Sequence, residues 1–233
     1  MHWEWLPQYL PLLAQGLYIT ILLLVISVVA GFLLAIPIGF VQVTGPKPLK
    51  DLAQGFCTFI RGTPLLVQLY LLYYGVGSLF PLLGSTFPAF GENFTWLIRL
   101  DAFYYALLAF TLSFAGYEAE VLRGAFLGVP RNELEAARAF GMPPWKVLTR
   151  IWLPQAIRHV LPTLAGETIN QLKATPLAFT IPVMDLMGVT SRIRQDTYLT
   201  YEPLLFLAFV YVVLTFLITR AFNYAEGLVP SRR

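Results

Sequence analysis

A run of 25 residues from about Leu17 to Val41 contains no charged side chain. A helix needs about 20 predominantly apolar residues to cross the hydrocarbon core of a bilayer, so this run is long enough to span it. Hydrophobic residues make up 57% of the chain and charged residues only 12%, about half the charged share of a typical soluble domain. A soluble core could not bury so much apolar surface. The sequence therefore predicts an all-α integral membrane protein.

Four further apolar stretches predict membrane-spanning helices. The second stretch is interrupted by Arg61-Gly62-Thr63-Pro64, which is either a structural kink or a break with a role in substrate passage. The sequence has no internal repeat, so its 233 residues predict one transmembrane domain, residues 1–233. The five predicted spans are about Leu17–Val41, Leu52–Leu79, Ala102–Leu122, His159–Val183 and Pro203–Tyr224.

The lysines and arginines indicate which way the chain crosses the membrane. If the N-terminus is outside, eleven of the 16 basic residues lie in cytoplasmic segments or, for Arg220, at the cytoplasmic end of the fifth span, and two, Arg61 and Lys173, lie within other spans. Only three, Arg99, Arg192 and Arg194, then lie in external loops. Because cytoplasmic loops carry an excess of Lys and Arg, we expect an external N-terminus and a cytoplasmic C-terminus.

The longest hydrophilic stretch runs over about residues 125–158. We predict a short helix capped by Asn132 with Glu135 three residues later, an arrangement typical of a capping box. Gly141 stands where a left-handed residue would end that helix. Pro143-Pro144 predicts the start of a second short helix, which we expect to end at Leu153-Pro154. From these features alone, a plain connection between spans is as good an interpretation as a docking surface.

The same loop resembles the EAA motif of ABC importer permeases, and residues 125–158 are called the coupling loop below after that resemblance. In that family the motif forms coupling helices that dock on the ATP-hydrolysing subunit, and this chain matches the motif at the expected spacing. The resemblance assigns ATPase coupling to Glu135, Ala136, Ala137, Gly141, Ile151, Leu153 and Pro154.

Most of the chain resembles the polar amino-acid branch of this family, in particular HisM-type subunits of histidine/lysine/arginine/ornithine and opine importers. The segments that carry this resemblance are 61–69, 115–124, 172–180 and 196–198. It implies uptake of amino acids, basic ones or opines, across the bacterial cytoplasmic membrane. It also implies two ATPase copies, a second and related permease, and an external binding protein. This chain would bind no cofactor, because ATP and Mg belong to the ATPase; the chain itself has no phosphate-binding loop motif.

Polar residues within the predicted spans are the candidates for a substrate pathway, because such residues are costly in a membrane. In the fourth span they recur every three or four residues and share one face. A structural role as interhelical hydrogen bonds is nearly as good an interpretation. Glu120 in the third span is expected to pair with Arg123. The pathway candidates are Thr163, Glu167, Asn170 and Gln171 in the fourth span and Glu118 in the third.

Other classes of protein fit the sequence less well. A self-contained secondary transporter remains the alternative, although such proteins often have more spans and internal repeats. A membrane enzyme is disfavoured because no nucleophile–base set or metal-ligand cluster is present, so we predict no catalytic and no metal-binding residues. No basic face interleaved with aromatic residues indicates nucleic-acid binding.

Overall fold

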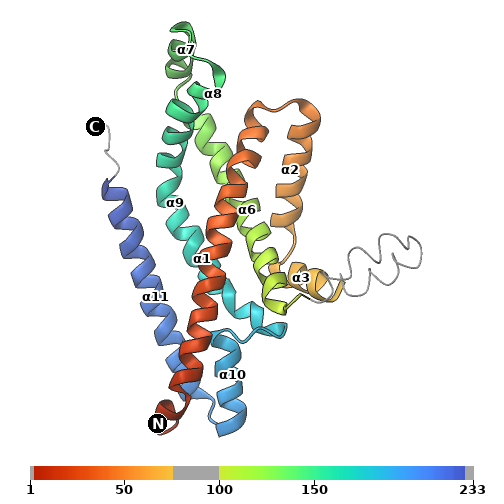
Figure 1. The fold of residues 1–233 in the computed structure, drawn as a ribbon, viewed down its shortest axis with the longest axis vertical. Coiled ribbons are helices and arrows are strands. Elements are labelled where there is room, and N and C mark those ends of the chain that lie inside the picture. Colours follow the sequence, from red (N-terminus) through yellow and green to blue (C-terminus); the bar gives the residue numbers. More distant parts are fainter. Residues whose placement is uncertain (1–2, 76–99, 229–233) are drawn as a thin grey trace, which may run out of the picture. The chain divides into compact units, whose positions relative to one another are not determined.

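A computed structural model of the chain describes residues 3–75 and 100–228. The described part is helical, with no β-strand (Figure 1). The long helices are α1 (Leu6–Thr44), α6 (Ala102–Gly128), α9 (Leu153–Ala174) and α11 (Tyr201–Leu228). The shorter ones are α2 (Lys47–Gly62), α3 (Leu65–Tyr70), α7 (Arg131–Ala139), α8 (Pro144–Val147) and α10 (Leu186–Thr197). The described residues also contain three irregular helical turns: η1 (Leu71–Gly75), η2 (Leu148–Trp152) and η3 (Thr175–Thr180).

Two of the described helices, α1 and α11, are long and apolar enough to cross a membrane, and α2 with α3–η1 would add a third span if that bent pair crosses as one. The predicted second span is therefore not one straight helix, because the chain breaks between Gly62 and Leu65. Part of that predicted span, residues 76–79, lies outside the described residues. Helix α6 covers the third predicted span, whereas α9 covers the fourth only as far as Ala174, where the chain passes into the turn η3 with Pro176 near its start. Polar residues such as Glu118 and Glu167 lower the hydropathy of both helices. The count of five spans stays a prediction.

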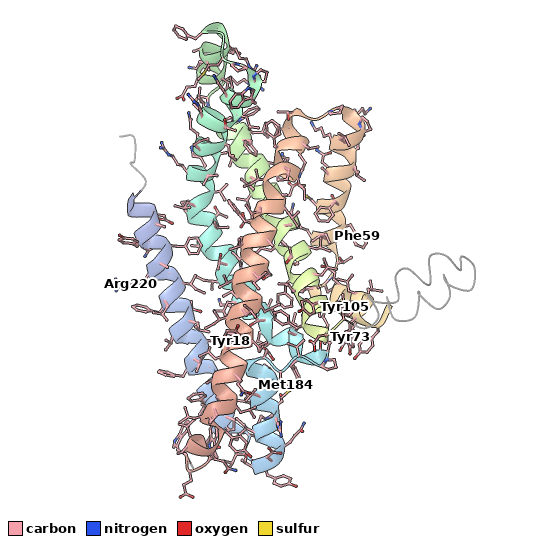
Figure 2. The ribbon with its side chains drawn as sticks, viewed as in Figure 1. Tyr18, Phe59, Tyr73, Tyr105, Met184 and Arg220 are labelled. Carbon is pink, nitrogen blue, oxygen red and sulfur yellow. The ribbon has the colours of Figure 1, made fainter. Side chains whose placement is uncertain are left out.

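The described chain divides into two compact units. The first comprises the described residues within 1–28, 63–112 and 171–214. One of its cores is formed by small and branched residues around Phe110, including Leu23, Leu69 and Ile181, all less than 2% exposed. Tyr73 and Tyr105 stack edge to face beside it, with ring centroids 5.6 Å apart (Figure 2).

Helix α10 is fixed within the first unit by polar contacts with its own first turn and with α1. The buried Asp185 side chain caps the helix by accepting a hydrogen bond from the Gly188 N–H at 2.8 Å. The Thr20 hydroxyl oxygen on α1 accepts a bond from the Leu186 N–H at 3.0 Å. A Cβ at Gly16 would lie 2.8 Å from Val189 Cγ2, so the close approach of α1 and α10 needs glycine there.

The second unit comprises the described residues within 29–62, 113–170 and 215–233. Its aromatic core joins Phe40, Phe126 and Trp152, whose ring centroids are 5.6 to 5.8 Å apart. The Trp152 indole N–H donates to the Phe126 carbonyl oxygen at 2.9 Å, which satisfies the polar end of the ring. This unit contains the whole coupling loop and four of the five pathway candidates.

Candidate functional site

Helix α7 opens the coupling loop, and it begins differently from the prediction. Its first residue is Arg131, Pro130 occupies the N-cap position, and no side chain caps the helix. The prediction that Asn132 is the cap is therefore wrong. Pro130 carries backbone angles φ −57° and ψ 126°, an extended conformation that feeds directly into the first turn. Asn132 is then already helical and cannot serve as the cap.

The end of α7 follows the prediction. Gly141 has a φ of 77°, and it is the only glycine with a positive φ in the described chain. The Met142 N–H donates to the Ala137 carbonyl at 3.1 Å and the Gly141 N–H donates to the Arg138 carbonyl at 2.9 Å. These two bonds define a Schellman motif, which satisfies carbonyls that a helix end would otherwise leave unpaired.

The second helix of the loop starts as predicted but does not end where predicted. Pro144 is the first residue of α8, and the chain continues through the π-helical turn η2 into α9. The expected end at Leu153-Pro154 is therefore wrong. Proline in a helix removes one N–H donor and crowds the preceding turn. The wider turn η2 directly precedes Leu153, so the helix accommodates Pro154 instead of stopping.

The residues of the EAA resemblance lie on both sides of this loop. Ala137 is buried, whereas Glu135, Ala136 and Gly141 are exposed. Ile151, Leu153 and Pro154 are partly buried at the other end of the loop. The Glu133 carboxylate accepts a hydrogen bond from the Gln155 side-chain amide, which ties α7 to α9.

Two aromatic residues that the sequence analysis did not single out project from the same surface. Phe140 is 90% exposed and Trp145 is 62% exposed. Large exposed aromatic side chains next to a charged helix are typical of the centres of protein interfaces. The signal in the sequence was their position beside the glycine turn and beside Pro143-Pro144.

The pathway candidates divide between the two units. In the second unit Glu118 of α6 is fully buried, and neither of its carboxylate oxygens has a hydrogen-bond partner among the described residues. Glu167 of α9 is partly exposed and belongs to the same unit. Thr163 and Asn170 are exposed.

Gln171 lies in the first unit, and its environment differs from that of the other candidates. Its side-chain amide is buried and donates to the Phe110 carbonyl oxygen at 2.9 Å and to the Ser27 hydroxyl oxygen at 3.3 Å. The side-chain amide of Gln171 therefore forms interhelical hydrogen bonds, which is the structural role considered for these polar residues in the sequence analysis.

An ionic cluster on α6 is larger than predicted. The expected pair is confirmed, with Arg123 Nη2 3.0 Å from Glu120 Oε2. Arg61 also approaches the same oxygen, at 3.6 Å, and its guanidinium lies 5.8 Å from the Tyr117 ring centroid. Sequence reasoning could not find the second arginine, because Arg61 and Glu120 are far apart in the chain.

These helices and the exposed coupling loop define a membrane-embedded transporter subunit. The family described as "Binding-protein-dependent transport system inner membrane component" matches residues 27–228, and the chain belongs to this family.

Several relatives are similar over nearly their whole length. The octopine transport system permease protein OccM of Rhizobium radiobacter is 37% identical over 95% of this chain and 87% of the relative. The probable amino-acid ABC transporter permease protein PatM of Vibrio harveyi is 33% identical, over 94% and 92%. The histidine/lysine/arginine/ornithine permease HisM of Escherichia coli K12 is 34% identical, over 91% and 86%.

Solved structures have the same fold. An amino acid ABC transporter crystallised with histidines matches with a TM-score of 0.80 and 29% identity, over 98% of this chain and 99% of that one. The inward-facing MetNI methionine ABC transporter matches with a TM-score of 0.76 at 17% identity, which shows the fold alone.

Proposed function

We propose that this chain is the permease subunit of an ATP-driven importer that carries amino acids, basic ones or opines, across the bacterial cytoplasmic membrane. It spans the membrane five times with its N-terminus outside. Two copies of a separate ATPase, a second and related permease chain and an external binding protein complete the importer. The observation that carries the proposal is the exposed coupling loop, which a Schellman turn and a Glu133–Gln155 bond hold in one shape.

The coupling loop transmits ATP-driven movement to the spans. Phe140 and Trp145 enter a groove of the ATPase, and exposed Glu135 pairs with a basic group beside it. Small Ala136 permits close approach. When ATP closes the ATPase dimer, the loop moves with it and the pathway changes from inward- to outward-facing. The other motif residues, Ala137, Gly141, Ile151, Leu153 and Pro154, hold the loop in shape.

Two carboxyl groups in the second unit favour a cationic solute. Glu118 is buried without a hydrogen-bond partner among the described residues, and a buried carboxylate is costly unless a cation compensates it. Glu167 is partly exposed on the adjacent helix. An ammonium or guanidinium group between them would relieve this cost. Thr163 and Asn170 are exposed on the same helix, and Gln171 completes the predicted pathway while also serving packing.

The names of two relatives agree with such a solute. OccM is described as an octopine permease and HisM as a histidine/lysine/arginine/ornithine permease. The carboxyl groups of Glu118 and Glu167 are the physical reason to infer that this chain also carries a cationic substrate.

Uptake by the reconstituted importer tests the substrate assignment. Glu167→Gln keeps the size and hydrogen-bonding capacity of the side chain and removes its charge. We expect it to reduce uptake of arginine-like solutes while the complex still assembles and hydrolyses ATP. If Glu167 serves only helix packing, Glu167→Gln will transport normally and Glu167→Leu will assemble poorly, and that pair of results would reject the pathway role.

Co-purification with the partner ATPase tests the coupling assignment separately. Glu135→Lys should weaken ATPase binding and abolish transport while the chain still inserts into the membrane. Glu4→Lys, an exposed change far from the loop in sequence, is the matched control and should leave binding unchanged. Normal transport by Glu135→Lys would show that this carboxylate has no docking role.

A further inference from the structure

A cleft of about 990 Å³ opens in the second unit at the base of the coupling loop. Its walls come from the loop, from the first turns of α9 and from the end of α11. This volume is at the upper end of the range typical of small-molecule sites. Ala136, Ile151 and Pro154 of the EAA resemblance lie on its rim. Its charged residues Arg150, Arg158 and Glu226 are used by neither the proposed pathway nor the docking surface, so they form a separate candidate site.

Basic and acidic side chains line different walls of this cleft. Arg150, Arg158 and His159 come from η2 and α9, while Glu226 comes from α11 and Glu133 from α7. Glu133 already accepts the Gln155 bond. The described residues form three ion pairs, and none of them involves Arg150, Arg158 or Glu226. Arg150, Arg158 and Glu226 therefore face one cleft without meeting in an ion pair among the described residues, an arrangement that fits a ligand carrying both charges.

The depth of the cleft indicates that the ligand also has an apolar part. Arg150 and Pro130 belong to the hydrophilic loop, whereas Leu161 and Pro162 lie just inside the fourth predicted span. Glu226 lies two residues beyond the predicted end of the fifth span, Tyr224. The cleft thus straddles the boundary between lipid headgroups and hydrocarbon, a depth where basic pockets between helices bind lipid headgroups.

We propose that this cleft binds the headgroup of a phospholipid that carries a primary ammonium group. Its phosphate pairs with Arg158 and Arg150, because a guanidinium presents paired donors to phosphate oxygens. Its ammonium group pairs with Glu226, and its acyl chains follow Leu161 and Pro162 into the bilayer. The bound lipid joins α9 to α11 next to the coupling loop. The inference goes beyond the proposed function, because it does not depend on which solute is carried.

Native mass spectrometry of the purified, delipidated importer measures this binding directly. Phosphatidylethanolamine, phosphatidylcholine and phosphatidylglycerol of equal chain length are titrated in turn. We expect the wild type to prefer phosphatidylethanolamine over phosphatidylcholine by about tenfold, since only the former can donate hydrogen bonds to Glu226. Glu226→Gln should abolish that preference and leave phosphatidylglycerol binding unchanged.

Variants on the arginine wall complete the test. Arg158→Gln should weaken binding of all three lipids by about tenfold, whereas Arg158→Lys, which keeps the charge, should retain most of it. Arg220→Gln is the matched control, because Arg220 lies on α11 beside Phe216 and does not line the cleft (Figure 2). Gel filtration checks that each variant assembles.

Three results would each overturn the proposal. The first is an unchanged lipid preference in Glu226→Gln. The second is equal weakening by Arg158→Gln and Arg220→Gln. The third is displacement of the lipid by an equal concentration of free phosphoethanolamine, which would identify a site for a soluble phosphate ester instead. Lipid binding is measured independently of transport. A negative lipid-binding result therefore does not affect the importer assignment, and a negative uptake result does not affect the lipid site.

Discussion

Gln171 on α9 donates a hydrogen bond to the backbone carbonyl oxygen of Phe110 on α6, at 2.9 Å, although 61 residues separate them. The same amide donates to Ser27 on α1, whose hydroxyl donates in turn to the Leu24 carbonyl. Three helices of the first unit therefore meet at one buried side chain. In a membrane, interhelical hydrogen bonds of this kind contribute about 0.6 kcal/mol on average and up to about 1.7 kcal/mol.

Gln171→Leu should therefore lower the free energy of unfolding by about 1 kcal/mol, because both donors are lost while the volume is nearly conserved. Thermal unfolding of the purified complex measures the change. Gln15→Leu, at an exposed position of α1 in the same unit, is the control and should unfold like the wild type. A Gln171→Leu variant as stable as its control would show that these bonds contribute nothing.

Local patterns predicted local structure well. Gly141 was identified from its place after a helical run, and its positive φ of 77° needs only neighbouring residues to define it. The start of α8 at Pro144 followed from the same local rules. Asn132 is not the N-cap because Pro130 occupies that position and the helix begins at Arg131.

Contacts distant in sequence could not be predicted. The spacing of Glu120 and Arg123 reveals their pair, since residues three apart on a helix are neighbours. No spacing reveals that Arg61 reaches the same carboxylate from another helix. Gln171 shares a helical face with the pathway candidates, but no spacing reveals its hydrogen-bond partners on α1 and α6, which give it a packing role.

The predicted orientation can be tested with single cysteines. The native Cys57 is buried and accepts a bond from the Gln42 amide at 3.3 Å, so Cys57→Ser, which keeps an acceptor, is a suitable background. Gln8 and Asn132 are both exposed. On intact cells an impermeant thiol reagent should label Gln8→Cys, and it should label Asn132→Cys only after permeabilisation. The reverse pattern would invert the topology.

Substitutions at Gly141 should separate backbone strain from steric contact. No atom lies within 4 Å of a Cβ built there, so the cost of a side chain is conformational. We expect Gly141→Ala to cost roughly 1 kcal/mol, Gly141→Asn less, and the β-branched Gly141→Val more. ATPase binding and transport should be highest in Gly141→Asn, lower in Gly141→Ala and lowest in Gly141→Val. Equal activity of all three would mean that the left-handed turn is not needed for docking.

The stability of the first unit should depend on the protonation of Asp185. Burial raises the pKa of this carboxyl from 3.8 to about 6, although its bond from the Gly188 N–H acts to lower it. The folded state therefore binds the proton more tightly than the unfolded state. The contribution of protonated Asp185 to the free energy of unfolding is therefore fully present below about pH 4, and it is lost as the pH rises toward 6.

Asp185→Asn keeps an acceptor at the helix N-cap and removes the titration. As the pH rises from about 4 to about 6, the unfolding temperature of the wild type should therefore fall relative to that of the variant. Asp196→Asn, at an exposed aspartate of the same helix, is the control. A difference that does not change with pH would show that Asp185 titrates normally.

Two glycines of α6 should respond oppositely to the same substitution. A Cβ at Gly116 would lie 2.5 Å from Ile60 Cγ2 and 2.9 Å from Ile60 Cβ, whereas a Cβ at Gly124 meets no atom within 4 Å. Gly116→Ala should thus separate α6 from α2 and destabilise the chain by about 1 to 3 kcal/mol. Gly124→Ala should be neutral or stabilise it by up to about 1 kcal/mol, since alanine is the better helix former.

Combining Gly116→Ala with Ile60→Ala provides the decisive comparison. Ile60→Ala removes Cγ2, the nearer clashing atom, so the double variant should lose less stability than the sum of the two single changes. The contact also positions the following residue, Arg61, which lies 3.6 Å from Glu120. Gly116→Ala should therefore weaken this pairing, and Glu120→Gln should cost less stability in the Gly116→Ala background than in the wild type. Strict additivity of both pairs in thermal unfolding would show that Gly116 does not set the approach of α2 to α6.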